Sequence, residues 1–491
     1  MNNQIVFSCS EHYVYPSKTY GFRPSEKYPE YPFEEIAEES NYAYELFREA
    51  LVLGEYDRNN YGTDHWNPLK DFVHPGDTVL IKPNLVMDHN PTGDGVECLF
   101  TQPGLIAAAI DYVIIAFQKK PGKIVVGDAP MQECNFEKLI QESGLDILIE
   151  FYKKKGYEIQ LVDFRGLKSK IIHGIHHSDT GFKTNGTIID LGADSEFSSC
   201  SSEELKRLRI TNYNPALLNQ HHNTLKNEYF VSNYMLSADV VINMPKPKTH
   251  RKAGITGALK NMVGINVRKE FLPHHTLGAK DGKIGDEYKR TSINKALSSF
   301  FKDKKNSAMS SKHYVWAYLL KNISRVFFYT GMAVGKDCFS EGSWYGNETI
   351  SRTICDLNKI LMYADKNGIM RPEMQRKIFI IGDMIVSGEK EGPVEPSKKD
   401  VGMIVIGENP VLFDECLASI MGVNPSDIPT IRQAKSVGKP YQLIKSGEGI
   451  IISNRGVWNK KHPSEIKSED SLMYIPTSGW RKVFYSTKTN D

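Results

Sequence analysis

The segment ADVVINMPKPKTHRKAGITGALKNMV, residues 238–263, determines the fold that we expect of this chain. It begins with an apolar run typical of a buried strand, continues through a loop stiffened by two prolines, and leads into a helix punctuated by glycines. Similar pairs of a buried strand and a Pro- or Gly-containing loop, each followed by a helical segment, begin at DTVLIKPN (77–84) and GKIVVGDAP (122–130). Such alternation predicts an α/β fold, with mostly parallel sheets flanked by helices.

Further strands and one helical stretch divide the chain. EIQLVDF (158–164), RKIFIIGDMI (376–385) and VGMIVIGENP (401–410) read as strands, and a basic helical stretch covers roughly residues 292–335. These patterns predict two lobes with a cleft and a helical insertion. The predicted segments are an N-terminal extension (1–75), a main α/β domain (76–300), a helical insertion (301–369), and a smaller α/β unit with a C-terminal tail (370–491).

Composition excludes several classes of protein. The 61 Lys and Arg residues nearly cancel the 59 Asp and Glu residues, which argues against a broad basic face for nucleic acid. The seven cysteines form no C-x-x-C pair, which argues against an iron–sulfur cluster and a zinc ribbon. The chain begins without the basic and apolar regions of a secretory signal, and Lys321 and Arg325 interrupt its most apolar later stretch. We therefore expect a cytoplasmic protein without a nucleic-acid partner or stable membrane insertion.

Polar residues follow the predicted strands, where open α/β sheets bind their ligands. These residues are Lys82, Asn84, Asp128, Lys246, Lys248, His250, Asp383 and Glu389. Their mixture of cations and carboxylates suits an anionic ligand and some acid/base chemistry. We expect Lys82, Asp128, Lys246 and Asp383 to lie at the carboxyl ends of strands and to line one cleft. A solvated turn is an equally good interpretation of the loop that carries Asp383 and Glu389.

The densest group of cations predicts an anion site at the start of a helix near residue 255. Helix amino termini offer unpaired N–H groups and a positive dipole end, and glycines let a ligand approach the backbone closely. The alternative is an ordinary Gly-rich turn with its lysines in water. The residues assigned to this ligand or cofactor site are Lys246, Lys248, Gly254, Thr256, Gly257 and Asn261, together with the strand-end residues named above.

His250, Lys260 and Asp128 are the predicted catalytic residues. A histidine takes or gives protons near neutral pH, and a desolvated lysine becomes a better nucleophile or anchor. His274 and His275 are the candidate metal ligands, and we expect one of them to converge with His250 and Lys260 on a reacting centre. In the alternative interpretation, Lys260 forms an ion pair with a carboxylate such as Asp383, and His274 and His275 only cap a loop.

These motifs resemble the family called domain of unknown function 362. The resemblance covers roughly residues 77–438 in the same order, and its most specific part is the Lys-x-Lys-Thr-His…Thr-Gly-x-x-Lys-Asn stretch from Lys246 to Asn261. Many members of that family carry a ferredoxin-like cysteine motif. This chain lacks that motif, so a cluster-based electron-transfer role does not carry over.

A more distant likeness is to the lactate racemase family, whose members use a nickel-pincer nucleotide. His250 stands ten positions before Lys260, and His275 stands fifteen positions after it, in the order that family uses for its cofactor lysine and nickel ligand. Asp128 occupies the region where that family has a second catalytic histidine, and Lys82-Pro83 stands where it has Arg-Pro. This resemblance implies a divalent metal or a nickel-pincer-like nucleotide as cofactor.

The sequence thus predicts an enzyme that acts on a small anionic or phosphorylated substrate in a basic cleft, with racemase- or epimerase-like acid/base chemistry. The first alternative is a non-catalytic protein that binds a phosphorylated or polyanionic ligand with the same lysines. The second is a redox or scaffold role, against which the missing cysteines count.

Overall fold

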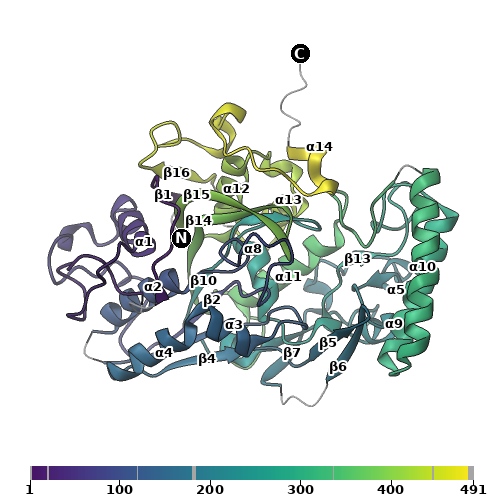
Figure 1. Cartoon of the computed structure of the whole chain (residues 1–491), viewed down its shortest axis with the longest axis horizontal. Helices are drawn as coiled ribbons and strands as arrows, with labels where there is room; N and C mark the ends of the chain where they lie inside the picture. Colours follow the sequence, from purple (N-terminus) through teal and green to yellow (C-terminus); the bar gives the residue numbers. More distant parts are fainter. Residues whose placement is uncertain are drawn as a thin grey trace.

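The computed structural model describes residues 3–18, 22–118, 120–179, 184–335, 337–444 and 447–484. A mixed sheet of ten strands forms its centre (Figure 1). Across this sheet the strands follow the order β16 (Ile450–Ser453), β1 (Gln4–Cys9), β15 (Glu395–Gly407), β14 (Lys377–Glu391), β10 (Val240–Met244), β2 (Thr78–Pro83), β3 (Lys123–Asp128) and β4 (Ile159–Asp163). A short hairpin of β11 (Lys248–His250) and β12 (Gly254–Thr256) joins the sheet at β14.

The five strands from β14 to β4 are all parallel to their neighbours. The long hairpin of β14 and β15 is antiparallel, as is the pairing of β15 with β1, whereas β1 and β16 are parallel. The predicted α/β fold with mostly parallel strands is therefore confirmed. The sheet also crosses the predicted boundaries, because β1 lies in the segment 1–75 and β14, β15 and β16 lie in the segment 370–491.

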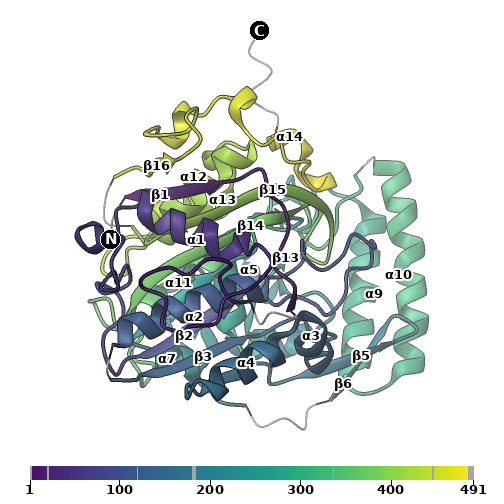
Figure 2. The ribbon, with the colours of Figure 1, turned by 60° about the vertical axis from the view of Figure 1, so that its left-hand side comes forward.

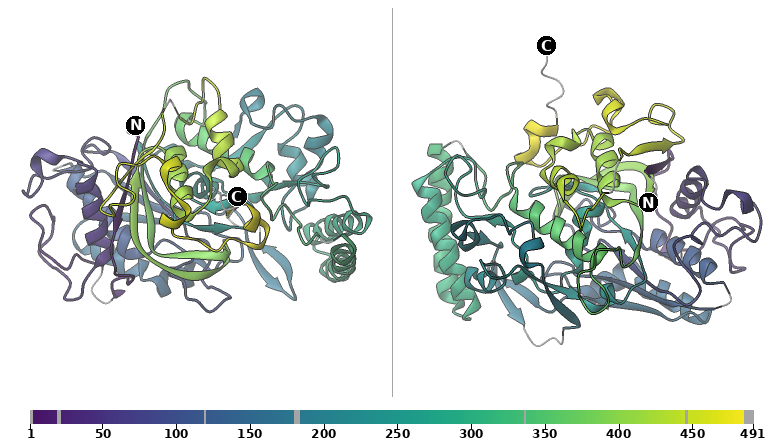
Figure 3. Two further views of the ribbon diagram at one scale, coloured as in Figure 1. Left: turned by 90° about the horizontal axis from the view of Figure 1, so that it is seen from above. Right: turned by 180° about the vertical axis from the view of Figure 1, so that it is seen from behind.

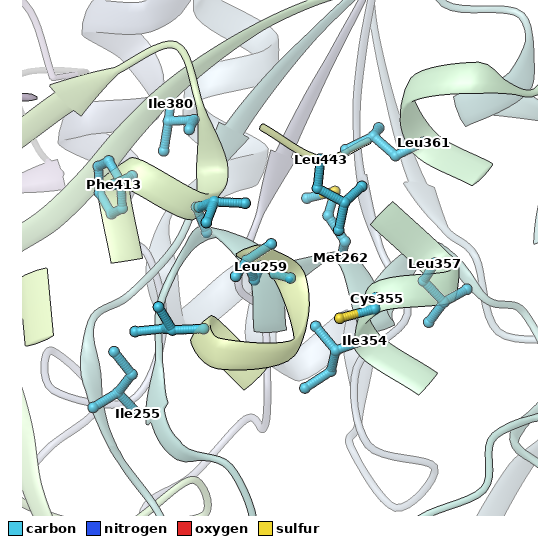
Figure 4. Close-up of a cluster of buried hydrophobic side chains, with 14 of the residues drawn as sticks. Ile255, Leu259, Met262, Ile354, Cys355, Leu357, Leu361, Ile380, Phe413 and Leu443 are labelled. Atoms are coloured by element: carbon cyan, nitrogen blue, oxygen red, sulfur yellow. The ribbon is translucent and has the colours of Figure 1, made fainter. Parts of the chain in front are cut away.

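Helices cover both faces of the sheet, and alternate strand residues point to the two sides. One cluster packs Val79, Val126 and Ile242 against α1 (Tyr42–Leu53), α2 (Pro103–Phe117), α3 (Phe136–Ser143) and α4 (Leu145–Lys154). The other packs Leu80, Val125 and Val241 against α8 (Ala258–Asn261), α11 (Thr349–Tyr363), α12 (Pro410–Met421) and α13 (Pro429–Ser436). Figure 2 shows α1 and α2 over the first face, and Figure 4 shows Leu259 and Met262 of the α8 region beside Ile354 of α11.

The remaining elements surround this core. They are β5 (Lys168–Ile172), β6 (Ile175–Asp179), β7 (Gly186–Asp190), α5 (Ser202–Lys206), β8 (Leu208–Arg209), α6 (Pro215–His221), β9 (Glu228–Ser232), α7 (Asn233–Leu236), β13 (His275–Thr276), α9 (Ile293–Ser310), α10 (Tyr314–Gly335) and α14 (Arg481–Phe484). The two long helices α9 and α10 form an antiparallel hairpin at one edge of the molecule (Figures 1 and 3). Within the described ranges, no helix is both long enough and apolar enough to cross a membrane.

The structure differs from the sequence interpretation at two helical segments. The helical segment that follows GKIVVGDAP is split into α3 and α4, because Gly144 adopts a left-handed conformation with φ of 84°. Instead of the glycine-punctuated helix expected after β10, the structure has a hairpin of β11 and β12 followed by the single turn α8. Gly254, with φ of 81°, is the first residue of β12.

Candidate functional site

A cavity of about 280 Å³ opens beyond the carboxyl ends of β2 and β3. It lies where the topology of an open parallel sheet favours ligand binding. Nine residues that the sequence singled out line it: Lys82, Asn84, Asp128, Lys248, His250, Thr256, Lys260, Asn261 and His274. Lys252 and Lys269, from the segment between Lys248 and His274, and Arg165 and Glu341, from loops distant in sequence, are among the residues that complete the wall.

Lys82 and Asp128 form a buried ion pair at the base of the cavity, 2.6 Å between Nζ and Oδ1. The Asp128 carboxylate also accepts hydrogen bonds from the backbone N–H of Leu85 at 2.7 Å and of Ala129 at 2.8 Å. Burial lowers the pKa of Lys82, and the neighbouring Asp128 charge opposes that shift. Asp128 therefore neutralises a buried lysine and fixes the loops after both strands, which is a positioning role.

Gly264 makes this ion pair possible. A Cβ at residue 264 would lie 2.0 Å from Asp128 Oδ1 and 2.7 Å from Lys82 Nζ, so any larger side chain would displace the pair. The backbone carbonyl of Gly264 also accepts a hydrogen bond from the Ala129 N–H at 3.1 Å. No local pattern distinguishes Gly264 from the other glycines, because its role depends on a contact between distant loops.

Lys260 lines the cavity without a counterion. It makes no hydrogen bond or ion pair with any residue in the described part of the chain, although it is partly buried. Burial lowers the pKa of Lys260 to about 8, and the nearby Lys82 adds to the effect while Asp128 opposes it. An amine with that pKa exchanges protons near neutral pH, and its charged form attracts an anion from solvent.

Two more lysines present donors to the same cavity. Lys248 donates to Asn84 Oδ1 at 3.0 Å and to the Leu99 carbonyl, and burial lowers its pKa to about 7. Lys252 donates to Thr211 Oγ1 at 3.2 Å and to the Glu341 carbonyl, and burial lowers its pKa to about 8. These lysines hold polar oxygens rather than carboxylates, so their charges are not neutralised by the contacts they make.

Two of the three cavity histidines, His250 and His274, are held in complementary tautomers. His250 Nδ1 lies 3.1 Å from the backbone N–H groups of both Lys252 and Ala253 and must accept from them, so the ring proton sits on Nε2. His274 Nδ1 lies 2.6 Å from the Leu272 carbonyl and must donate to it, so Nε2 carries a lone pair. Burial lowers the pKa of His274 to about 3 and that of His250 well below its usual value.

The structure corrects the predicted role of Lys246 and Asp383. They lie at the same end of the sheet as the cavity but form their own buried ion pair, 3.1 Å between Nζ and Oδ2, rather than lining it. Tyr15 contacts both residues of this pair. Its hydroxyl donates a hydrogen bond to Asp383 Oδ1 at 2.5 Å and accepts one from Lys246 Nζ at 2.7 Å. Asp383 is thus the partner of Lys246 and not of Lys260.

Glu389 is also absent from the cavity wall. Its carboxylate contacts Lys399 Nζ at 3.3 Å and accepts a hydrogen bond from the backbone N–H of Ile475 at 3.0 Å. It therefore fastens the C-terminal segment to β14. Glu389 thus holds the C-terminal segment and takes no part in the predicted ligand or cofactor site.

The predicted anion site at the start of a helix is occupied by the protein itself. The Asp414 carboxylate accepts from the backbone N–H of Ala258 at 2.5 Å and of Leu259 at 3.1 Å, so these two amides are already used. Gly257 packs against that carboxylate, and Gly254 packs against the Trp480 ring. Thr256 lines the cavity beyond this turn. Of the lysines predicted for the anion site, Lys248 lines a cavity formed by side chains, and Lys246 lies outside it in its ion pair with Asp383.

The candidate metal ligands diverge. His274 lines the cavity, whereas His275 faces a separate small pocket beside Glu287 and Lys302. Across the described ranges, no group of three His, Cys, Asp or Glu side chains is placed to hold a metal ion. The residues present thus do not fit the nickel site that the racemase resemblance implies. His250, Lys260 and His274 do line one cavity, as the convergence hypothesis requires of one of the two histidines.

Several residues of the cavity wall were missed, although one of those named below, Arg165, follows a strand of the main sheet. Arg165 lies beyond β4 and pairs with Asp163 at 2.7 Å, while Lys252 and Lys269 come from the irregular segments around α8. Glu341 comes from the loop after the helical hairpin and contacts Lys302 at 3.2 Å. The density of cations between residues 246 and 269 was a usable signal for the two lysines, and no local signal marked Glu341.

Comparisons with known proteins give one family and one curated relative. A family model described as "Domain of unknown function (DUF362)" matches residues 147–419, which contain β10, the β11–β12 hairpin, β14 and β15. The "Thylakoid-associated protein sll1697" of Synechocystis sp. is 27% identical over 211 residues, which cover 43% of this chain and 46% of that protein. The chain thus spans less than half the length of this relative. No solved structure matches significantly.

Proposed function

This chain belongs to the DUF362 family, and we propose that it is an enzyme that binds a small anionic substrate in the cavity and transfers a proton through Lys260. The observation that carries the proposal is the Lys260 ammonium, which faces the cavity without a carboxylate partner among the described residues. A charge buried in this way is costly unless a ligand supplies the opposite charge.

The charge of the cavity wall supports an anionic substrate. Seven Lys and Arg residues line the cavity against three Asp and Glu residues, and one of those acids, Asp128, is already paired with Lys82. Lys248 and Lys252 hold neutral oxygens and remain available to a carboxylate or phosphate group. An anion bound between these lysines would gain charge-assisted hydrogen bonds, each about 1.5–3 kcal/mol.

The groups around the cavity suit removal of a proton from a carbon next to a carboxylate or carbonyl. The free amine of Lys260 takes the proton as the C–H bond breaks, and the electron pair moves onto the carbonyl oxygen. His250 Nε2–H is the neutral donor that stabilises this oxyanion, since both Nδ1 contacts hold the proton on Nε2. Return of the proton from Lys260, or from a group on the other side of the substrate, gives an isomerase-like outcome.

His274 complements this arrangement as an acceptor. Its Nε2 lone pair is fixed by the Nδ1–H bond to the Leu272 carbonyl, so the ring orients a substrate hydroxyl or ammonium group. No step requires a metal, and the residues that the resemblance would assign to nickel lie in different pockets.

The test separates an enzyme from a binding protein. Inorganic phosphate binding is measured by calorimetry, and deuterium uptake from D₂O is followed by NMR for a panel of 2-oxo and 2-hydroxy carboxylates and their phosphate esters. We expect the wild-type protein to exchange a carbon-bound proton of at least one compound, and His250→Ala and Lys260→Met to abolish that exchange. Tight phosphate binding without exchange of any compound would favour the non-catalytic anion-binding alternative, with Lys260→Met weakening affinity and His250→Ala changing it little.

A further inference from the structure

The outer face of the helical hairpin is apolar and unusually exposed. Side chains of α10 that lie more than two-fifths exposed are Val315, Trp316, Tyr318, Leu319, Ile323, Val326, Tyr329 and Val334. Ile293, Leu297 and Phe300 of α9 add to them. Scattered exposed apolar residues are ordinary on soluble proteins, but a row of this length on one helix marks an interaction surface.

Helical spacing places this row on a single side of α10. Trp316, Leu319, Ile323, Val326 and Val334 recur at intervals of three, four, three and eight residues, so they fall within a narrow arc. The opposite side packs on α9, where Ser324 exchanges hydrogen bonds with Ser298. Because α10 lies outside α9 at the edge of the molecule (Figure 2) and the side chains of the row are exposed, the apolar row faces away from the body of the protein.

The charges of the two helices are mostly positive. Residues 293–335 contain seven Lys and Arg side chains and one acid, Asp303, which Arg209 pairs with at 3.1 Å. Lys304, Lys312 and Arg325 are exposed, and Lys304 Nζ lies 5.4 Å from the centre of the exposed Phe300 ring. Pairing two copies of this face would bring like charges together, whereas a surface of acidic headgroups would neutralise them.

We propose that the α9–α10 hairpin docks the protein onto the surface of a membrane that contains anionic lipid. The apolar row enters the boundary between headgroups and acyl chains, Trp316 and the tyrosines lie at the level of the headgroups, and the lysines and Arg325 contact lipid phosphates. The hairpin lies in the membrane plane and does not span it. This proposal is independent of the chemistry assigned to the cavity.

The fluorescence emission of Trp316 reports docking of the hairpin. The other four tryptophans, Trp66, Trp344, Trp458 and Trp480, are buried, so only Trp316 at 65% exposure changes its environment when the hairpin meets lipid. The full-length protein is mixed with vesicles of phosphatidylcholine alone or with phosphatidylglycerol added, since an anionic lipid gives the surface a negative potential. We expect co-sedimentation with the anionic vesicles, a blue shift of the Trp316 emission, and weaker binding at high salt.

Variants separate the apolar from the electrostatic contribution. Removal of each exposed cation (Lys304→Gln, Lys312→Gln, Arg325→Gln) should weaken binding about fivefold, the equivalent of about 1 kcal/mol per charge at an anionic surface. Leu319→Ser with Val326→Ser should abolish the blue shift, while the matched control Leu225→Ser, a change of an 89% exposed leucine outside the hairpin, should leave binding intact.

Three results would overturn the proposal. The first is failure to sediment with either kind of vesicle. The second is binding that the Leu319→Ser/Val326→Ser protein retains in full. The third is a dimer in light scattering that the same substitutions dissociate, which would assign the face to a second copy of the chain. Circular dichroism and thermal melting confirm that each variant is folded before it is scored.

Discussion

Substitution of Lys260 by methionine should stabilise the folded protein at neutral pH while destroying anion binding. Burial lowers the pKa of Lys260 from 10.5 to about 8, a difference of about 2.5 pH units. At 1.36 kcal/mol per unit, the folded state carries a penalty of about 3 kcal/mol for holding this proton at pH 7. Methionine has a similar length and no charge, so Lys260→Met removes the penalty and keeps the packing of the stem.

The sign of the pH dependence follows from linkage. Between pH 8 and pH 10.5 the unfolded chain holds the lysine proton and the folded chain does not, so wild-type stability rises with pH across this window. The advantage of Lys260→Met is therefore complete below pH 8 and disappears by about pH 10.5. Unfolding entropy of about 2.1 cal/mol/K per residue gives roughly 1 kcal/mol/K for this chain, so the expected gain is about 3 °C in Tm.

The measurement is thermal unfolding of both proteins at pH 7 and at pH 10, with Lys283→Met as the control. Lys283 is exposed, so its replacement should leave Tm unchanged at either pH. A variant that melts at or below the wild-type temperature at pH 7 would contradict the reasoning, because it would mean that Lys260 has a stabilising partner. An advantage that persists undiminished at pH 10 would show that the gain comes from packing and not from the charge.

Three other predictions concern the same cavity. Lys82→Met should lower the free energy of unfolding by about 3–5 kcal/mol, because it leaves Asp128 as an uncompensated buried charge. In denaturant unfolding, the Lys82→Met/Asp128→Asn double variant should recover most of this loss. Gly264→Ala should weaken the binding of inorganic phosphate, measured by calorimetry, by at least tenfold, because the added Cβ would displace the ion pair. The control Gly438→Ala should bind phosphate like the wild type, because its Cβ would meet no atom within 4 Å. The kcat/KM of a proton-exchange substrate should rise as pH increases through about 8, where the Lys260 amine loses its proton, and a flat profile across that range would remove Lys260 as the base.

Much of the sheet follows from local pattern. The strands β2, β3, β4, β10, β14 and β15 were each recognisable as short apolar runs that end in Gly, Pro or charged residues. Because the carboxyl ends of parallel strands meet at one edge, Lys82, Asp128 and Lys248 could be assigned to one site without a structure. β1 was missed, since its six-residue run is not followed directly by a helical segment, and its place between β15 and β16 makes it part of the core.

The errors share one physical cause, which is pairing between distant segments. Asp414 of α12 caps α8, and this contact decides that the Gly254–Gly257 segment serves packing rather than ligand binding. Tyr15 and Asp383 enclose Lys246 in the same way. A sequence shows which charges exist but not which of them neutralise each other, so it could identify the lysines of the site and not the one left without a partner.

Titration of Lys260 itself tests the central claim most directly. The Nζ resonance of ¹⁵N-labelled lysine, assigned by its loss in Lys260→Arg, is followed by NMR from pH 6 to pH 11 with and without inorganic phosphate. The account predicts a pKa of about 8 in the free protein and a higher pKa when phosphate is bound, because the anion stabilises the ammonium form. A pKa near 10.5 that phosphate does not move would contradict it, since Lys260 would then be neither desolvated nor in contact with an anion.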